Sequence, residues 1–259
     1  MGERTEYSPG TFCWADVTTT DQDGAKAFYG GLFGWEADDR PIGEGAYYSM
    51  MQLDGKDVAA IAPQPSQQRE AGLPPLWNSY ISVENADETA EKAKELGANV
   101  HAPPFDVMEA GRMAVIGDPQ GAFFAVWEPR DHFGAALVNG PGLLSWNDLS
   151  SPNPKAAAGF YSGLFGWTVT SFEVGDVTYN AIKNGEAYNG GIRELDREGV
   201  PPHWLVYFGT DDVGEALAKV EELGGMKLTE PIDMHTAKIG VAQDPQGAVF
   251  ALYAGRFEP

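Results

Sequence analysis

Basic residues are scarce in this chain, because 17 lysines and arginines stand against 38 aspartates and glutamates, for a formal net charge of −21. A surface with this balance repels phosphate backbones and anionic lipids, so we expect neither nucleic acid nor a membrane as a partner. The charge favours a cationic ligand, but a strongly acidic surface also serves solubility alone.

Cysteine is nearly absent, since Cys13 is the only one. An internal disulfide is therefore excluded, which fits a reducing compartment. The N-terminal segment MGERTEYSPG has no apolar run behind its charges, and no stretch approaches the roughly 20 apolar residues of a membrane helix. We expect a cytoplasmic protein.

Several catalytic motifs are also missing. The sequence has no glycine-rich phosphate-binding loop, no G-x-S-x-G elbow and no Cys–His pair in the setting of a nucleophile. The four histidines lack the short spacing of paired metal ligands; they are His101, His132, His203 and His235.

An internal repeat is the strongest positive feature. The segment FYGGLFGW (28–35) returns as FYSGLFGW (160–167), and the DPQG turn at 118–121 returns at 244–247. Collinear similarity on both sides of these segments indicates a duplication. We therefore expect a first domain over residues 1–130, a linker over 131–140 and a second domain over 141–259.

Each half contains the same order of elements twice. A strand is followed by an amphipathic helix and three further strands, which predicts βαβββ modules over about 9–62, 76–130, 141–192 and 202–257. Asp21 is suited to cap the first helix, and Gly34 stands where a helix-ending glycine belongs. The fold class is therefore α+β.

This pattern resembles the vicinal oxygen chelate superfamily, which includes glyoxalase I, extradiol dioxygenases and bleomycin-binding proteins. The resemblance is carried by the paired modules, the D…FY..LFGW helix and the DPQG turn. It is strongest to tandem actinobacterial proteins of the glyoxalase-like or hydroxylase type. It implies two tandem glyoxalase/bleomycin-resistance-like domains with cup-shaped mixed sheets.

Metal-dependent members of that superfamily hold one divalent ion in each cup through His, Gln or Glu side chains. Counting from the helix and the turn places the corresponding positions at Trp14, Asn78, Ala125, Trp146, Leu205 and Ala251. Only Asn78 could offer a weak oxygen ligand. Glu128 would reach the cup only through a β-bulge. We expect no metal site and no other cofactor.

Strand alternation then predicts which residues line the cups. The expected ligand-binding residues are Trp14, Asn78, Tyr80, Trp127, Trp146, His203, Tyr207 and Tyr253, and Phe12 and Leu144 should face inward as well. Asp16 and Asp148 are the candidate catalytic residues, because an inward carboxylate must be paired, hydrogen-bonded or titrating. In the alternative interpretation the tryptophans are plain core and Asp16 caps a loop.

Three functions are compatible with these cups. The first is a metal-independent protein that binds a small aromatic or cationic metabolite. The second is a cofactor-independent tailoring enzyme of hydroxylase, isomerase or cyclase type, with Asp16 or Asp148 as the base. The third is a metal-dependent glyoxalase or dioxygenase. Four modules in one chain are enough for a monomer, and surface contacts leave a homodimer open.

Overall fold

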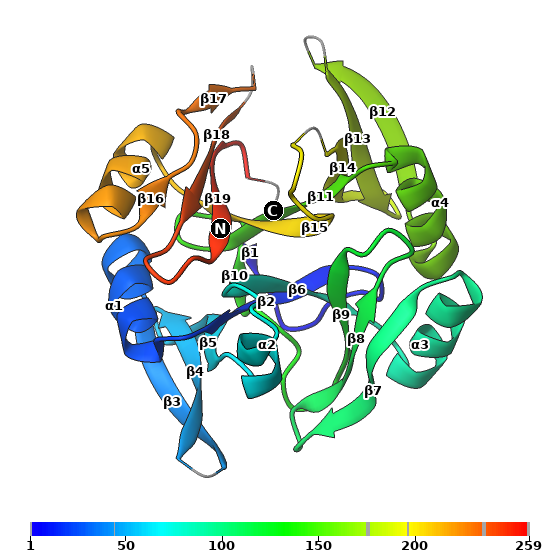
Figure 1. Ribbon diagram of the computed structural model, residues 1–259, viewed down its shortest axis with the longest axis horizontal. Coiled ribbons are helices and arrows are strands. Elements are labelled where there is room, and N and C mark those ends of the chain that lie inside the picture. The colour runs from blue at the N-terminus through cyan, green and yellow to red at the C-terminus, as the bar shows by residue number, and fades with distance from the viewer. Residues whose placement is uncertain (1, 44, 175–176, 196, 235–236, 258–259) are drawn as a thin grey trace.

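The computed structural model describes residues 2–43, 45–174, 177–195, 197–234 and 237–257. Each half of the sequence forms one large curled sheet (Figure 1). The first sheet has the strand order β3-β4-β5-β2-β6-β9-β8-β7. Its strands are β2 (Phe12–Thr19), β3 (Glu36–Gly43), β4 (Ala46–Leu53), β5 (Lys56–Pro63), β6 (Leu76–Ser82), β7 (Asn99–Val107), β8 (Gly111–Gly117) and β9 (Phe123–Pro129).

The second sheet repeats this arrangement with the order β12-β13-β14-β11-β15-β19-β18-β16, and β17 pairs with β18 beside it. Its strands are β11 (Leu144–Ser151), β12 (Thr168–Val174), β13 (Val177–Asn184), β14 (Ala187–Glu194), β15 (His203–Gly209), β16 (Met226–Lys227), β17 (Ile232–Asp233), β18 (Ala237–Gln243) and β19 (Val249–Gly255). The short strands β1 (Gly2–Glu3) and β10 (Leu137–Val138) pair separately.

Each half builds its own concave sheet from two modules. Within a module the last strand lies parallel to the first, as β5 does to β2 and β9 to β6. The two modules meet where their first strands pair antiparallel, β2 with β6 and β11 with β15. The predicted α+β fold with four βαβββ modules is confirmed, whereas the exact domain boundaries stay a prediction.

The first long helix begins and ends at the predicted residues. α1 (Gln22–Phe33) starts where the Asp21 carboxylate accepts a hydrogen bond from the Gly24 N–H. It ends at Gly34, which has a φ of 74°, a left-handed conformation that glycine adopts without strain. α4 (Pro154–Phe165) has the same ends, with Asn153 as the cap and Gly166 at a φ of 75°.

The other helices are α3 (Ala86–Glu95), α5 (Val213–Glu222) and the short α2 (Ser66–Glu70). α2 falls in the Pro- and Gln-rich segment that joins the first two modules, where the sequence predicts no helix. Among the described residues, no helix has the length and hydrophobicity needed to cross a membrane.

The four longer helices pack between the halves, so that α1 lies beside α5 and α3 beside α4 (Figure 1). The two main cores therefore mix residues of both halves; one contains Phe28, Tyr29, Trp35, Trp77, Phe208 and Phe250. The Tyr29 hydroxyl donates to Asp244 at 2.9 Å and accepts from the Trp77 indole at 2.9 Å. The repeat supplies a matching bridge, in which Tyr161 donates to Asp118 and accepts from Trp204.

A bulge near the start of each central strand overturns part of the expected alternation. The register shifts between Phe12 and Trp14 and again between Leu144 and Trp146, which leaves one extra residue in each strand. Phe12 therefore packs against Trp204 at a ring distance of 5.0 Å. Leu144 lies in a core between the halves. The prediction that Phe12 and Leu144 face the cups was wrong, because a bulge reverses the alternation of side chains.

Candidate functional site

The Asp16 carboxylate lies at the floor of the first cup in a closed set of hydrogen bonds. It accepts from the Tyr80 hydroxyl at 2.7 Å, the Asn78 amide at 2.8 Å and the Tyr48 hydroxyl at 2.9 Å. Trp14 donates its indole N–H to Tyr48 at 2.9 Å. Burial raises the pKa of Asp16, while hydrogen bonds from Tyr80, Asn78 and Tyr48 act in the opposite direction. Four predicted site residues thus belong to one network.

Asp148 holds the equivalent place in the second cup. It accepts from the Tyr179 hydroxyl at 2.7 Å, the Tyr207 hydroxyl at 2.8 Å and the Trp146 indole at 2.9 Å. Burial raises the pKa of Tyr207 well above its ordinary value, so this phenol stays protonated and donates. Gly191 makes room for the network, because a methyl group there would overlap the Tyr179 hydroxyl.

Tyr48 and Tyr179, the third donors to these carboxylates, were missed by sequence reasoning. Both come from the next-to-last strand of the first module in their half, so the strand register alone brings them over the aspartates. A tyrosine in each of these matching strands was the available signal.

A segment that follows β9, residues 131–136, covers the floor of the first cup. Its backbone is held where Ala135 N–H donates to the Cys13 carbonyl at 2.8 Å and Ala136 N–H donates to the Asp57 carbonyl at 2.7 Å. The His132 ring stands edge-on to Trp14 at 4.6 Å. Trp127, the remaining predicted residue of this cup, donates its indole N–H to the His132 carbonyl at 2.8 Å. We call residues 131–136 the cap segment.

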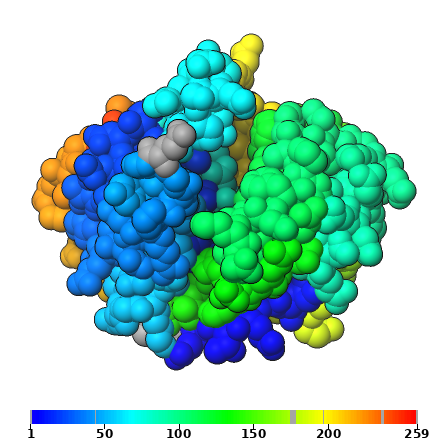
Figure 2. Space-filling model, turned by 90° about the horizontal axis from the view of Figure 1, so that it is seen from below, coloured from blue at the N-terminus to red at the C-terminus, as the bar shows by residue number. Residues whose placement is uncertain are grey.

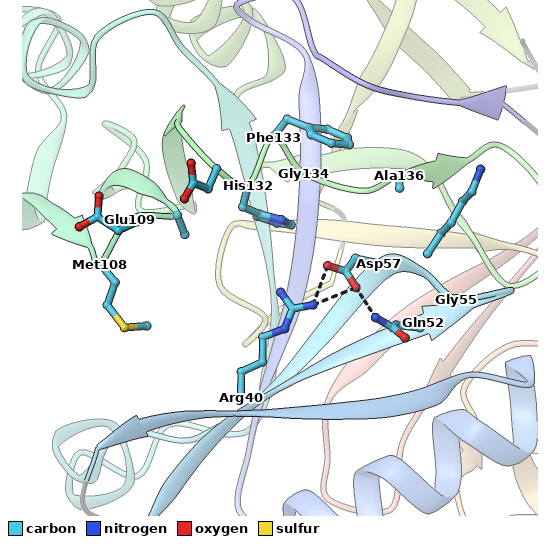
Figure 3. A pocket seen from close by; sticks show the side chains of 13 residues that line it. Arg40, Gln52, Gly55, Asp57, Met108, Glu109, His132, Phe133, Gly134 and Ala136 are labelled. Atoms are coloured by element: carbon cyan, nitrogen blue, oxygen red, sulfur yellow. Dashed lines mark hydrogen bonds and ion pairs between the residues drawn. The ribbon is translucent and has the colours of Figure 1, made fainter.

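A surface pocket of about 650 Å³ lies on the outer side of the cap segment. It opens between the arm formed by β3 and β4 and the turn that joins β7 to β8 (Figure 2). On one wall Arg40 pairs with Asp57 at 3.1 Å, and Gln52 donates to Asp57 at 2.8 Å; His132 and Phe133 lie opposite (Figure 3). The cap segment thus separates this charged pocket from Asp16.

The buried His132 ring is expected to make the stability of the folded protein depend on pH. Burial lowers the pKa of His132 to about 4, whereas an unfolded chain would titrate near 6.5. Between these values the unfolded state binds more protons, so stability is complete above pH 6.5 and falls as the pH drops towards 4. We expect the free energy of unfolding, measured by chemical denaturation, to fall by about 3 kcal/mol across this window. In H132Q the free energy of unfolding should lose this part of its dependence on pH. An identical pH dependence in both proteins would show that His132 is not its source.

The second cup is more open than the first. Trp14 and Trp127 are 4% and 6% exposed, whereas their counterparts Trp146 and Tyr253 are only half-buried. Half-buried Ile239, Val241 and Val249 pack with them against Leu205, Tyr207 and Ala251. The predicted residues Trp146 and Tyr253 therefore form a partly exposed apolar surface packed against the buried Tyr207, which was also predicted. His203 lies in the same sheet but has no hydrogen bond to Asp148.

One row of polar residues in the second cup joins the predicted His203 to Ser150 and Arg193, two residues that the sequence did not single out. Ser150 lies opposite Arg193 of β14 on one side and opposite His203 of β15 on the other. The matching residues of the first cup are Thr18, Ala62 and Leu76. An alignment of the two halves at these strand positions would have revealed the difference, because two apolar residues of the first cup become Arg and His.

The residues present do not fit a divalent ion at the positions that metal-dependent proteins use. Trp14, Trp146, Leu205, Ala125 and Ala251 offer indole or alkyl groups. The carboxylates of Asp16 and Asp148 each accept three hydrogen bonds, from hydroxyl, amide or indole donors. Glu128 accepts from the Ala86 N–H at the start of α3 and so points away from the cup. Within the described ranges, no three His, Cys, Asp or Glu residues form a group that could hold a metal; His235 lies outside those ranges.

Comparison with known proteins matches both halves to related families. Residues 11–126 match the Glyoxalase/Bleomycin resistance protein/Dioxygenase superfamily, and residues 148–253 match the Glyoxalase-like domain. CFP32 of Mycobacterium bovis, which is named as a glyoxylase, is 44% identical over 255 residues, covering 97% of both chains. The anthracycline biosynthesis protein DauV of Streptomyces sp. (strain C5) is 32% identical, covering 96% of this chain and 94% of its own.

Solved structures share the fold at low sequence identity. The Mn(II)-bound glyoxalase from Novosphingobium aromaticivorans has a TM-score of 0.66 and 17% identity, covering 95% of this chain and 82% of that one. The 2,2',3-trihydroxybiphenyl 1,2-dioxygenase from Sphingomonas wittichii has a TM-score of 0.65 and 12% identity, covering 96% and 92%. At these identities the likeness concerns the fold alone.

Proposed function

The chain belongs to the glyoxalase/bleomycin resistance protein/dioxygenase superfamily, and from this premise we propose that it binds a small aromatic molecule in its second cup without a metal ion. The observation that carries the proposal is the state of its seven tryptophans. Six are buried, and Trp146 alone is half-buried. A half-buried aromatic ring that is fixed in place offers a ligand a stacking surface, and binding then costs little side-chain entropy.

The surroundings of Trp146 support an aromatic ligand. Its indole N–H donates both to Asp148 and to the Tyr179 hydroxyl, each at 2.9 Å, which holds the ring rigidly. Tyr253 and the half-buried aliphatic side chains add apolar surface around it. A purely cationic ligand is less well matched, because Asp148 already takes three donors and Arg193 adds a positive charge to this cup. All strands of the cup come from one half, which supports a monomer.

The proposal predicts unequal roles for two matched tryptophans. We expect W146F to weaken binding of a planar probe such as 1-naphthol about tenfold, which is about 1.4 kcal/mol, because the ring loses area and its anchoring N–H. W14F should leave the affinity unchanged, because Trp14 lies under the cap segment. Isothermal titration calorimetry measures both. Equal losses in the two variants, or no binding by any member of a panel of neutral, anionic and cationic aromatics, would refute the proposal.

A tailoring enzyme is the second candidate function, and the similarity to an anthracycline biosynthesis protein favours it. In that case Asp148 would accept a proton from a bound substrate and Tyr207, 2.8 Å away, would return one. Asp16 is a poorer base for this purpose because it lies beneath the cap segment; both carboxylates are buried, Asp16 at 3% and Asp148 at 6% exposure. Turnover that persists in D148N on a confirmed substrate would remove this candidate.

A further inference from the structure

Three polar side chains meet in one row of the second cup. The register places Ser150 of β11 between Arg193 of β14 and His203 of β15. Ser150 is two residues beyond Asp148, and Arg193 is two residues beyond Gly191, which faces Asp148. Strand alternation therefore directs these side chains to the concave face that carries Asp148.

Two atoms of this row lack a partner. The Ser150 side chain is 1% exposed, and its Oγ has no hydrogen bond to any described residue. The Arg193 Nε is buried and also has none, and the described carboxylates form no ion pair with its guanidinium. A buried polar group without a partner is destabilising, so most such groups in proteins are satisfied. A ligand with an acceptor group would satisfy both.

His203 adds an acceptor to this pair of donors. Its Nδ1 lies 2.9 Å from the Pro201 carbonyl, which can only accept, so Nδ1 carries the hydrogen. Burial lowers the pKa of His203; the hydrogen bond to Pro201 acts in the opposite direction and the Arg193 charge lowers it further, so the net shift favours the neutral ring. Its Nε2 is then free to accept a hydrogen bond from a hydroxyl group.

The first cup has no such row. Thr18 occupies the place of Ser150, but its hydroxyl donates to the Leu76 carbonyl at 3.4 Å. Ala62 and Leu76 stand where the second cup has Arg193 and His203. The duplication therefore provides the same backbone twice, and only the second copy carries a cation with unpaired donors.

We infer that Arg193, Ser150 and His203 form a carboxylate-binding subsite, and that the ligand of the second cup is an aromatic hydroxy acid. The carboxylate would accept from the Arg193 guanidinium and the Ser150 hydroxyl, and a neighbouring ring hydroxyl would donate to His203 Nε2. The ring would extend towards Trp146. Arginine suits this role because its planar fork matches a carboxylate. The inference rests on the proposed function and specifies its ligand class.

A matched pair of probes tests the subsite. We expect 1-hydroxy-2-naphthoate to bind the unaltered protein at least tenfold more tightly than 1-hydroxy-2-naphthamide, measured by titration calorimetry, since only the acid carries a charge for Arg193. In R193Q the ratio should fall below about twofold, and R193K should retain part of it because it keeps the charge without the fork. R69Q, which removes an exposed charge on α2, should leave the ratio unchanged.

The outcomes separate this inference from the proposed function. If the amide binds as tightly as the acid, or if R193Q keeps the full ratio, the carboxylate subsite is wrong although the cup still binds an aromatic ligand. If neither probe nor 1-naphthol binds, the proposed function is overturned together with the subsite. The comparison of acid and amide in the unaltered protein needs no variant, so it is decisive even if R193Q fails to fold.

Discussion

Replacing Asp244 by alanine is expected to lower the free energy of unfolding by about 3–5 kcal/mol. One carboxylate oxygen accepts from the backbone N–H groups of Gln246, Gly247 and Ala248 at 2.8–3.0 Å. The other accepts from the Tyr29 hydroxyl of the opposite half. Alanine would leave the buried Ala248 N–H and Tyr29 hydroxyl and the half-buried Gln246 N–H without this acceptor, whereas the Gly247 N–H keeps its bond to the backbone carbonyl of residue 244. Chemical denaturation measures the loss.

The matching bridge gives an internal control. D118A should cost a similar amount, because Asp118 accepts from two backbone N–H groups and from the Tyr161 hydroxyl. A double-mutant cycle of Y29F with D244A isolates the contact between the halves, and we expect a coupling of about 1–2 kcal/mol. A coupling near zero would show that the hydroxyl bridge does not stabilise the packing of the halves.

Substituting alanine for Gly134 is expected to lift the cap segment from the first cup and to cost about 3 kcal/mol. Gly134 has a φ of 124°, and a methyl group there would overlap the Cys13 carbonyl, a backbone atom that cannot move aside. The hydrogen bond from Ala135 to that carbonyl would be lost. Exposure of Trp14 should then increase acrylamide quenching, and the pKa of His132 should rise from about 4 towards 6.5.

Gly121 provides the control for backbone strain. Its φ is 99°, and a methyl group there would meet no atom within 4 Å, so G121A carries the conformational cost without the overlap. We expect G121A to cost about 1 kcal/mol and to leave quenching and the His132 pKa unchanged. If G134A and G121A give the same loss of stability, the same quenching and the same His132 pKa, the close approach of Gly134 to the Cys13 carbonyl does not hold the cap segment in place.

Much of the fold could be predicted because its signals are local. The caps at Asp21 and Asn153, the glycines at Gly34 and Gly166 and the repeated DPQG turns depend on neighbours within a few residues. The cup positions of Trp14, Asp16, Trp146 and Asp148 followed from strand alternation beyond the bulge. Phe12 and Leu144 were misplaced because one extra residue in a strand reverses every side chain before it.

Long-range contacts decided the rest. The sequence shows Tyr29 and Asp244 as ordinary members of a repeat, 215 positions apart, and only packing joins them. The sequence predicts a linker where the cap segment lies. In the structure, backbone hydrogen bonds to Cys13 and Asp57 hold this segment so that His132 lies against Trp14. Such contacts depend on the relative position of distant elements, which no local pattern encodes.

The sequence by itself therefore determined the duplicated βαβββ architecture, the aspartate and tryptophan of each cup and the absence of His, Gln and Glu from the six positions counted from the helix and the turn. Tertiary structure decided how the two cups differ. In the first, the cap segment buries Trp14 and Asp16; in the second, Trp146 stays half-buried and the same sheet carries the unpaired Ser150 Oγ and Arg193 Nε. The physical reason is that residue identity is local, whereas burial and hydrogen-bond satisfaction depend on which distant segments pack over a residue.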